Sequence, residues 1–233
     1  MRRCNLLACI WSGPLFALLF FSGWGLMAGF LPPPEPTATA QQIGELYRSN
    51  AGSIRLGMML VMSSGGFFAP WIAVTYVLMR RIEGNDFPVL SMTQALAGTY
   101  GIVTIIIPSM IWTTAAFRPE RDIELIMLLN DLGWLNLTMI YSPAFVQTIA
   151  IGLIILQDRR ALPLFPRWLG YFNIWVAVLY LPAILISSFK SGPFAWNGIL
   201  SFWIPAIAFL VWFIVLARYM IIAVDGELKP PQD

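Results

Sequence analysis

Residues 118–141 read RPERDIELIMLLNDLGWLNLTMIY, and this stretch decides what kind of fold the chain can adopt. A cluster of charges at 118–122 runs without a break into an apolar segment that continues to Tyr141. Asp131 is the only acid placed between two apolar runs, where a carboxylate is costly unless a partner pairs with it. Glu124 lies seven residues earlier, so one helix would project both carboxylates from nearly the same side.

The composition of the whole chain is that of a membrane protein. Its 233 residues are 58% hydrophobic and 11% charged, with mean hydropathy +0.74, whereas soluble domains carry about 25% charged residues. The net charge of +2 and the absence of an extended basic patch give no support for a nucleic-acid partner. Histidine is absent, and Cys4 and Cys9 are the only cysteines, so we expect no metal site and no cofactor.

Six apolar runs are long enough to cross a bilayer, because a span needs about 20 residues. They cover about 9–30, 54–79, 89–116, 132–156, 168–189 and 198–222. The first run is long for a signal-peptide core and prolines follow it, so we interpret it as an uncleaved span. The predicted fold class is therefore all-α, a polytopic bundle of six transmembrane helices that forms a single domain over 1–233.

The distribution of basic residues predicts the orientation of the bundle. With a cytoplasmic N-terminus, nine of the fourteen basic residues lie inside and five outside, which has the sign of the positive-inside rule. The inside set is Arg2, Arg3, Arg80, Arg81, Arg159, Arg160, Arg167, Arg218 and Lys229, and the outside set is Arg48, Arg55, Arg118, Arg121 and Lys190. Both termini are therefore expected to be cytoplasmic.

The longest connection, 31–53, is expected to hold a short helix on the outer surface. Thr39 is a suitable N-cap for a helix over residues 40–50, with Ile43, Leu46 and Tyr47 on one side. Such a helix would either cover the bundle as a lid or serve as a solvated connector.

The depth of the charged residues predicts an ion pair at the outer rim. A rise of about 1.5 Å per residue puts Asp131 about 40 Å from Asp158, beyond a hydrocarbon thickness of about 30 Å. The same arithmetic brings Arg55 to a similar level, so we predict that Arg55 pairs with an ionised Asp131. Arg118 and Arg121 are the alternative partners. The middle of the bilayer is left without charge, and its polar groups are neutral: Gln94, Asn136, Thr138, Tyr141, Gln147, Asn173 and Tyr180.

Two further patterns are compatible with a cavity. Each apolar run contains one proline, namely Pro14, Pro70, Pro108, Pro143, Pro182 and Pro205. Proline is common in membrane helices, so these residues are either ordinary or kinks that open the bundle. One helical face of the fourth run carries Asp131, Trp134, Thr138, Tyr141, Phe145 and Thr148, as an interhelix contact or a ligand-facing surface.

Five linked segments resemble an uncharacterised family of bacterial six-span integral membrane proteins. They are FLPPP at 30–34, FRPER at 117–121, LLNDLGW at 128–134, FPRWLGYFN at 165–173 and GPFAWNG at 192–198. The resemblance covers most of the chain and implies six spans in a bacterial cytoplasmic membrane. The family has no established activity, so the resemblance implies no chemistry.

Three functions fit these observations. The first is binding or transport of a small lipophilic molecule in a cavity open to the extracytoplasmic side. The second is a membrane enzyme that uses Asp131 and Glu124 as acid and base on a lipid-soluble substrate. The third is an accessory subunit of a larger membrane complex, and homo-oligomers and membrane lipids are the other expected partners. The residues expected to bind or gate a ligand are Arg55, Trp112, Glu124, Asn130, Asp131 and Trp134.

Overall fold

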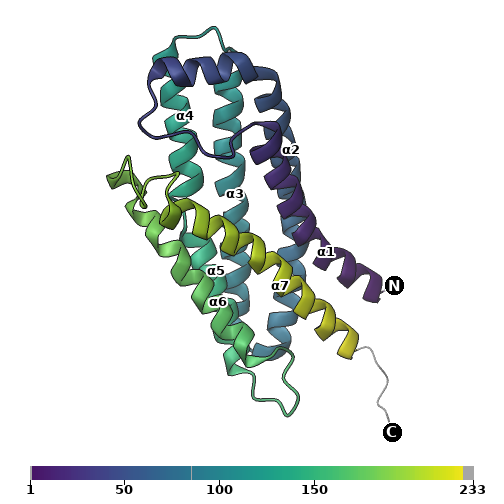
Figure 1. Ribbon diagram of the computed structural model, residues 1–233. Helices are drawn as coiled ribbons and strands as arrows, with labels where there is room; N and C mark the ends of the chain where they lie inside the picture. The colour runs from purple at the N-terminus through teal and green to yellow at the C-terminus, as the bar shows by residue number, and fades with distance from the viewer. Residues whose placement is uncertain (1, 85, 228–233) are drawn as a thin grey trace.

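The computed structural model describes residues 2–84 and 86–227, and every regular element in these ranges is helical (Figure 1). In chain order they are α1 (Arg2–Phe21), the π-helix η1 (Ser22–Met27), α2 (Ala40–Glu83), α3 (Val89–Phe117), α4 (Ile123–Thr138), α5 (Ser142–Gln157), α6 (Arg167–Tyr180), the 3₁₀-helix η2 (Leu181–Ser188), the π-helix η3 (Ile199–Trp203) and α7 (Ile204–Glu227).

Six of the described segments are long and apolar enough to cross a membrane, which confirms the predicted fold class. They are Arg3–Met27, Ala40–Glu83, Val89–Phe117, Ile123–Gln157, Arg167–Ser188 and Ile199–Gly226. The first, second and fourth of them begin earlier than expected, at Arg3, Ala40 and Ile123. Hydropathy detects residues that partition into lipid, whereas a helix continues through polar residues until a cap or a proline ends it.

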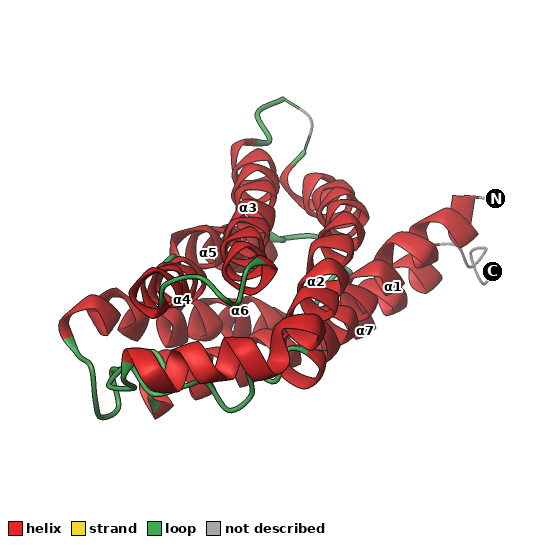
Figure 2. Cartoon of the chain, turned by 90° about the horizontal axis from the view of Figure 1, so that it is seen from above, coloured by secondary structure: helices red, strands yellow, loops and turns green. Residues whose placement is uncertain are grey.

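The first turns of α2 form the expected helix over residues 40–50. The Thr39 hydroxyl accepts a hydrogen bond from the Gln42 backbone N–H (3.3 Å), and the Gln42 side chain accepts one from the Thr39 N–H (2.8 Å). This part of α2 lies across the ends of α3 and α4 (Figures 1 and 2). Gly44 permits the close approach, since a Cβ there would lie 2.7 Å from Ile123. We call this end of the bundle the covered end.

The start of α1 and the end of α7 lie near each other, away from the covered end, and we call this part of the bundle the terminal end (Figure 1). Arg3 of α1 forms an ion pair with Asp225 of α7 at 2.8 Å. An even number of spans requires that the first span begins on the side of the membrane where the last span ends, and this ion pair agrees with that. Lys229 lies outside the described residues, and which end faces the cytoplasm remains a prediction.

The six prolines fall into two groups. Pro14, Pro70 and Pro108 lie inside continuous helices. The other three each stand at the second residue of an element that follows a break or a change of helix type: Pro143 in α5, Pro182 in η2 and Pro205 in α7. A proline removes the backbone N–H that would bond to the carbonyl four residues earlier, so a helix changes most easily at such positions.

Candidate ligand-binding cavity

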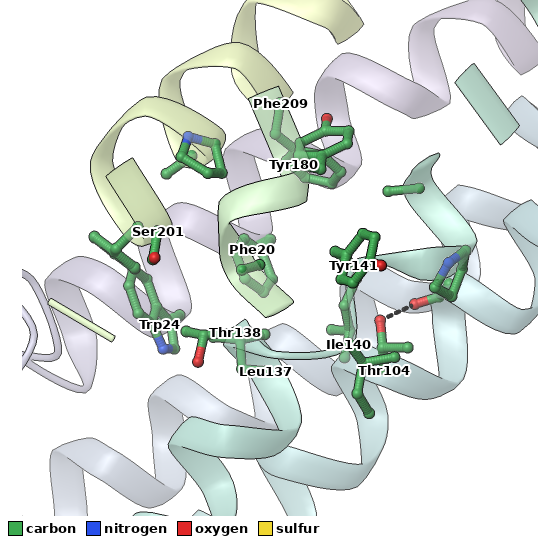
Figure 3. A pocket seen from close by; sticks show the side chains of 18 of the residues that line it. Phe20, Trp24, Thr104, Leu137, Thr138, Ile140, Tyr141, Tyr180, Ser201 and Phe209 are labelled. Carbon is green, nitrogen blue, oxygen red and sulfur yellow. Dashed lines mark hydrogen bonds between the residues drawn. The ribbon is translucent and has the colours of Figure 1, made fainter. Parts of the chain in front are cut away.

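A half-open cavity of about 180 Å³ lies between the helices, and all six spans contribute to its wall (Figure 3). Most of the wall is aromatic or aliphatic, with Phe20, Phe68, Tyr141, Tyr180 and Phe209 among the larger side chains. An engineered apolar cavity of about 150 Å³ holds one benzene molecule. The volume is therefore that of a single ring or a short stretch of hydrocarbon.

The irregular parts of the spans converge on this cavity. The π-helix η1 contributes Trp24, the gap between α4 and α5 contributes Ile140 and Tyr141, η2 contributes Ala183, and η3 contributes Ser201. Irregular backbone at membrane depth is tolerated where it is buried in protein or lines a cavity, and π-helical turns occur frequently at functional sites. Four of the six spans therefore depart from a regular α-helix where they meet the cavity.

Local interactions hold these irregular segments in place. The Ser201 hydroxyl lies 3.2 Å from the backbone oxygens of both Pro182 and Phe194, which ties η3 to the start of η2. The backbone of η1 packs closely against α2, since a Cβ at Gly57 would lie 2.3 Å from the Gly23 oxygen. Freed backbone carbonyls and close helix approach are thus both accommodated by neighbouring spans.

Three hydroxyl groups in the wall already donate hydrogen bonds to backbone oxygens. Thr104 donates to the Gly101 oxygen (2.8 Å), Thr138 to the Trp134 oxygen (2.6 Å), and Ser201 to η2 as described. Such bonds are intrahelical for both threonines and leave the hydroxyl oxygen as an acceptor only. The phenols of Tyr141 and Tyr180 add two further polar groups to the wall.

Two N–H groups of wall residues are buried and have no hydrogen-bond acceptor among the described residues. They are the amide Nε2 of Gln147, whose side chain belongs to α5, and the indole Nε1 of Trp24. Gly98 of α3 makes room for the amide, because a Cβ at that position would lie 2.6 Å from Gln147 Nε2. A buried donor without an acceptor costs about 1–3 kcal/mol, so these two groups are an energetic cost of the packing around the cavity.

The lining is electrically neutral. No Asp, Glu, Lys or Arg is among the described residues that form it. Within 2–84 and 86–227 no group of three potential metal-ligating side chains comes together either. A charged ligand would be buried here without a counter-ion, which is strongly unfavourable, so the cavity suits an uncharged molecule.

None of the six residues predicted to bind or gate a ligand is among the described residues that line this cavity. Trp112 and Trp134 are buried at the covered end and pack together with ring centroids 5.2 Å apart. Trp134 also contacts Trp24 of the cavity wall, at 5.6 Å. Asn130 is buried beneath α2, where it accepts a hydrogen bond from the Tyr47 hydroxyl (3.3 Å). Glu124 is exposed in the first turn of α4.

The predicted ion pair between Arg55 and Asp131 is not formed. The Arg55 guanidinium donates to the backbone oxygen of Ala51 on its own helix (3.3 Å), and the half-buried Asp131 carboxylate accepts from the Asn130 amide (3.2 Å). Among the described residues no cation, Arg118 and Arg121 included, makes an ion pair with Asp131, and Lys190 is the cation whose charge acts on it. A depth scale carries no information on the face of α2 on which Arg55 lies, so it could not predict these partners.

The expected ligand-facing surface of the fourth span is partly present. Thr138 and Tyr141 line the cavity and Trp134 lies behind it. The break after Thr138 changes the direction of the remaining residues of that face. Gln147 was noted as a neutral polar residue at mid-depth, but its sequence carries no signal that it faces a cavity. Trp24 was not singled out by the sequence, because one tryptophan in an apolar run is common.

No family model, curated protein or solved structure matches the chain. The motif resemblance therefore identifies no family. The described residues support a polytopic membrane protein with six candidate spans.

Proposed function

We propose that the protein binds a small, uncharged, lipophilic molecule in the central cavity, as a binding protein or as part of a transport path. The observation that carries this proposal is the convergence of irregular segments from four spans on one cavity. Regular helices would pack more tightly and would satisfy their own backbone groups. Departures from regular structure at one place indicate that the space itself is used.

The neutrality of the lining favours binding over the two other functions. An enzyme that uses Asp131 and Glu124 would need both carboxylates at the substrate, and neither is among the lining residues. A subunit that acts only by packing against a larger complex would need no internal cavity. Proton-coupled carriers place ionisable groups near the midplane, and this wall has only neutral polar groups.

We further propose that the protein resides in a bacterial cytoplasmic membrane, with both termini cytoplasmic and the covered end on the extracytoplasmic side. The support is the motif resemblance and the distribution of basic residues. Reporter fusions after Arg81 and Arg160 should be active as cytoplasmic fusions, and a fusion near Gly192 as an external one. One reversed fusion among the three would contradict this orientation.

The proposal is tested by extraction of the protein with its native lipids, followed by mass spectrometry of the lipophilic molecules it retains. Ala206 lines the cavity, so Ala206→Phe fills part of it. Ala69→Phe is the matched control, because Ala69 is exposed on α2. A molecule retained by the wild type and Ala69→Phe but lost from Ala206→Phe supports the proposal. Equal retention by all three proteins contradicts it, and a stoichiometric protein partner with no such molecule would favour an accessory subunit.

A further inference from the structure

The cavity lies at the middle of the third span. Gly101, Thr104 and Ile105 of α3 belong to its lining. Gly101 lies twelve residues after the start of α3 at Val89, and Ile105 lies twelve residues before its end. At about 1.5 Å per residue, both are about 18 Å from the nearer end of the helix. Half of the hydrocarbon thickness is about 15 Å, so the cavity is level with the centre of the bilayer.

Aromatic rings fill the space between the cavity and the terminal end. Phe68 of the lining stacks on Phe16 with ring centroids 4.8 Å apart and packs edge-on against Phe213 at 5.7 Å. Trp71 lies one turn farther from the covered end and packs against Trp212 (5.8 Å) and Phe213 (5.1 Å). The four rings beyond Phe68 are at most 2% exposed. A ligand therefore has no open path through these rings.

A second set of rings closes the side that faces the covered end. Trp24 of the lining packs against Trp134, at 5.6 Å between centroids. Trp134 in turn packs against Phe30 (5.6 Å) and Trp112 (5.2 Å). All four side chains are at most 1% exposed, and the first turns of α2 lie across this end (Figure 1). This direction is therefore filled by side chains as well.

The cavity is nevertheless half-open, so its opening lies between these two sets of rings. Thr104 of α3, Tyr141 after α4 and Ala206 of α7 are lining residues that keep part of their surface exposed. Their neighbours Val103 and Ile207 are exposed and apolar, as a lipid-facing surface requires. We propose that the cavity opens sideways into the hydrocarbon core of the bilayer and takes ring-sized, uncharged molecules dissolved there. This inference rests on the proposed function, and its route differs from the extracytoplasmic opening expected from the sequence.

Two photoactivatable probes distinguish the route from the binding function. The first is free phenyl(trifluoromethyl)diazirine, and the second is a phosphatidylcholine that carries the same aryl diazirine at the end of one acyl chain. The headgroup keeps the tethered probe in the bilayer, so its ring can enter only through a side opening. The full-length protein is illuminated in liposomes with either probe. Tandem mass spectrometry then compares the label on Phe209, which lines the cavity, with that on the exposed Leu210, which does not.

Both probes should label Phe209 in the wild type and in the control Ala69→Phe. Ala206→Phe should remove most of this label and leave that of Leu210, and Ala144→Leu, which narrows the cavity from α5, should act in the same direction. If the free probe labels Phe209 and the tethered probe does not, the side opening fails and the binding function stands. If neither probe labels it, the proposed function fails. Tethered label that persists in both filled variants reaches Phe209 from the outer surface and overturns the inference.

Discussion

In the covered-end cluster the rings of Phe30, Trp112 and Trp134 have centroids 5.0–5.6 Å apart, whereas the aromatic side chains below them surround a cavity of about 180 Å³. The two regions are built from the same residue types and touch through Trp24 and Trp134. Both contain indole N–H groups without an acceptor. In the cluster the Trp112 nitrogen packs directly against Gly133, so no molecule can reach it.

The unpaired donors do not distinguish the two regions. A donor enclosed by packed rings has only their faces as weak partners, and that is a structural compromise. The Gln147 amide is enclosed in the same way, since its Nε2 packs against Gly98, so the two regions differ in the open volume between their aromatic side chains. The comparison therefore assigns rigidity to the covered-end cluster and ligand binding to the cavity, and substitutions can test the two assignments separately.

The largest expected difference is between two glycine-to-alanine substitutions, one in the packed cluster and one in the cavity wall. A Cβ at Gly133 would lie 2.2 Å from the Trp112 nitrogen, so Gly133→Ala should lower the free energy of unfolding by about 3 kcal/mol or more. At Gly101 in the cavity wall, the nearest atom would be 3.6 Å away, in Phe68. Gly101→Ala should be neutral or stabilising by up to about 1 kcal/mol, since alanine favours the helix. Thermal unfolding in detergent measures both, and equal losses would remove the distinction between a packed and a hollow region.

A second prediction concerns the cost of the unpaired amides. Gln147→Met should stabilise the ligand-free protein by about 1–3 kcal/mol, because it removes a buried donor without a partner. Gln94→Met should stabilise it by a similar amount, and it should leave ligand binding intact. The melting temperatures of the two variants test this directly. A clear loss of stability in Gln147→Met would mean that the amide makes a hydrogen bond within the protein and is not an unpaired donor.

The sequence predicted the spans well because every residue of an apolar run contributes to the hydropathy that identifies a span. It also located the cap of α2 at Thr39 and the three prolines, Pro143, Pro182 and Pro205, that stand at helix breaks. It did not distinguish these from Pro70, which α2 accommodates without a break. Whether a proline interrupts a helix depends on the neighbouring helices that satisfy the freed carbonyl, and that information is not local.

The site was harder to predict for the same reason. The ion pair of Arg55 with Asp131 was predicted from depth alone, and a depth scale has no information on which face of a helix points inward. Gln147 was recognised as a neutral polar residue at mid-depth, and only the packing of α3 against α5 shows that Gly98 makes room for it. Charges attract attention in a membrane sequence, whereas here the wall of the cavity consists of neutral side chains.

The third prediction concerns Asp158, in the loop at the terminal end. Both oxygens of its carboxylate accept hydrogen bonds. Its carboxylate accepts from the Arg160 side chain and from the backbone N–H groups of Arg160 and Leu164. The Arg160 hydrogen bond is the main reason that the pKa of Asp158 falls from 3.8 to about 2. A lowered pKa stabilises the folded state above the unfolded value, so about 1–2 kcal/mol should be lost as the pH falls from about 4 to about 2. Asp158→Asn should show a smaller loss over that range, and an identical pH profile would contradict the assignment.

The smallest effect is expected for Asp131 and Arg55, which do not contact each other. The stability changes of Asp131→Asn and Arg55→Gln should add to within about 0.5 kcal/mol in the double variant. A double-mutant cycle read by thermal unfolding in detergent measures this. A coupling of more than about 1 kcal/mol would restore the ion pair and would require α2 to turn about its axis.

The cavity as a ligand site is tested most directly by an experimental map of the protein purified with its native lipids, for example by cryo-electron microscopy with a bound antibody fragment. The account predicts density for a compact, ring-sized, uncharged molecule between Tyr141 and Phe209. A cavity closed by the side chains of Tyr141 and Phe209, with no such density, would contradict it.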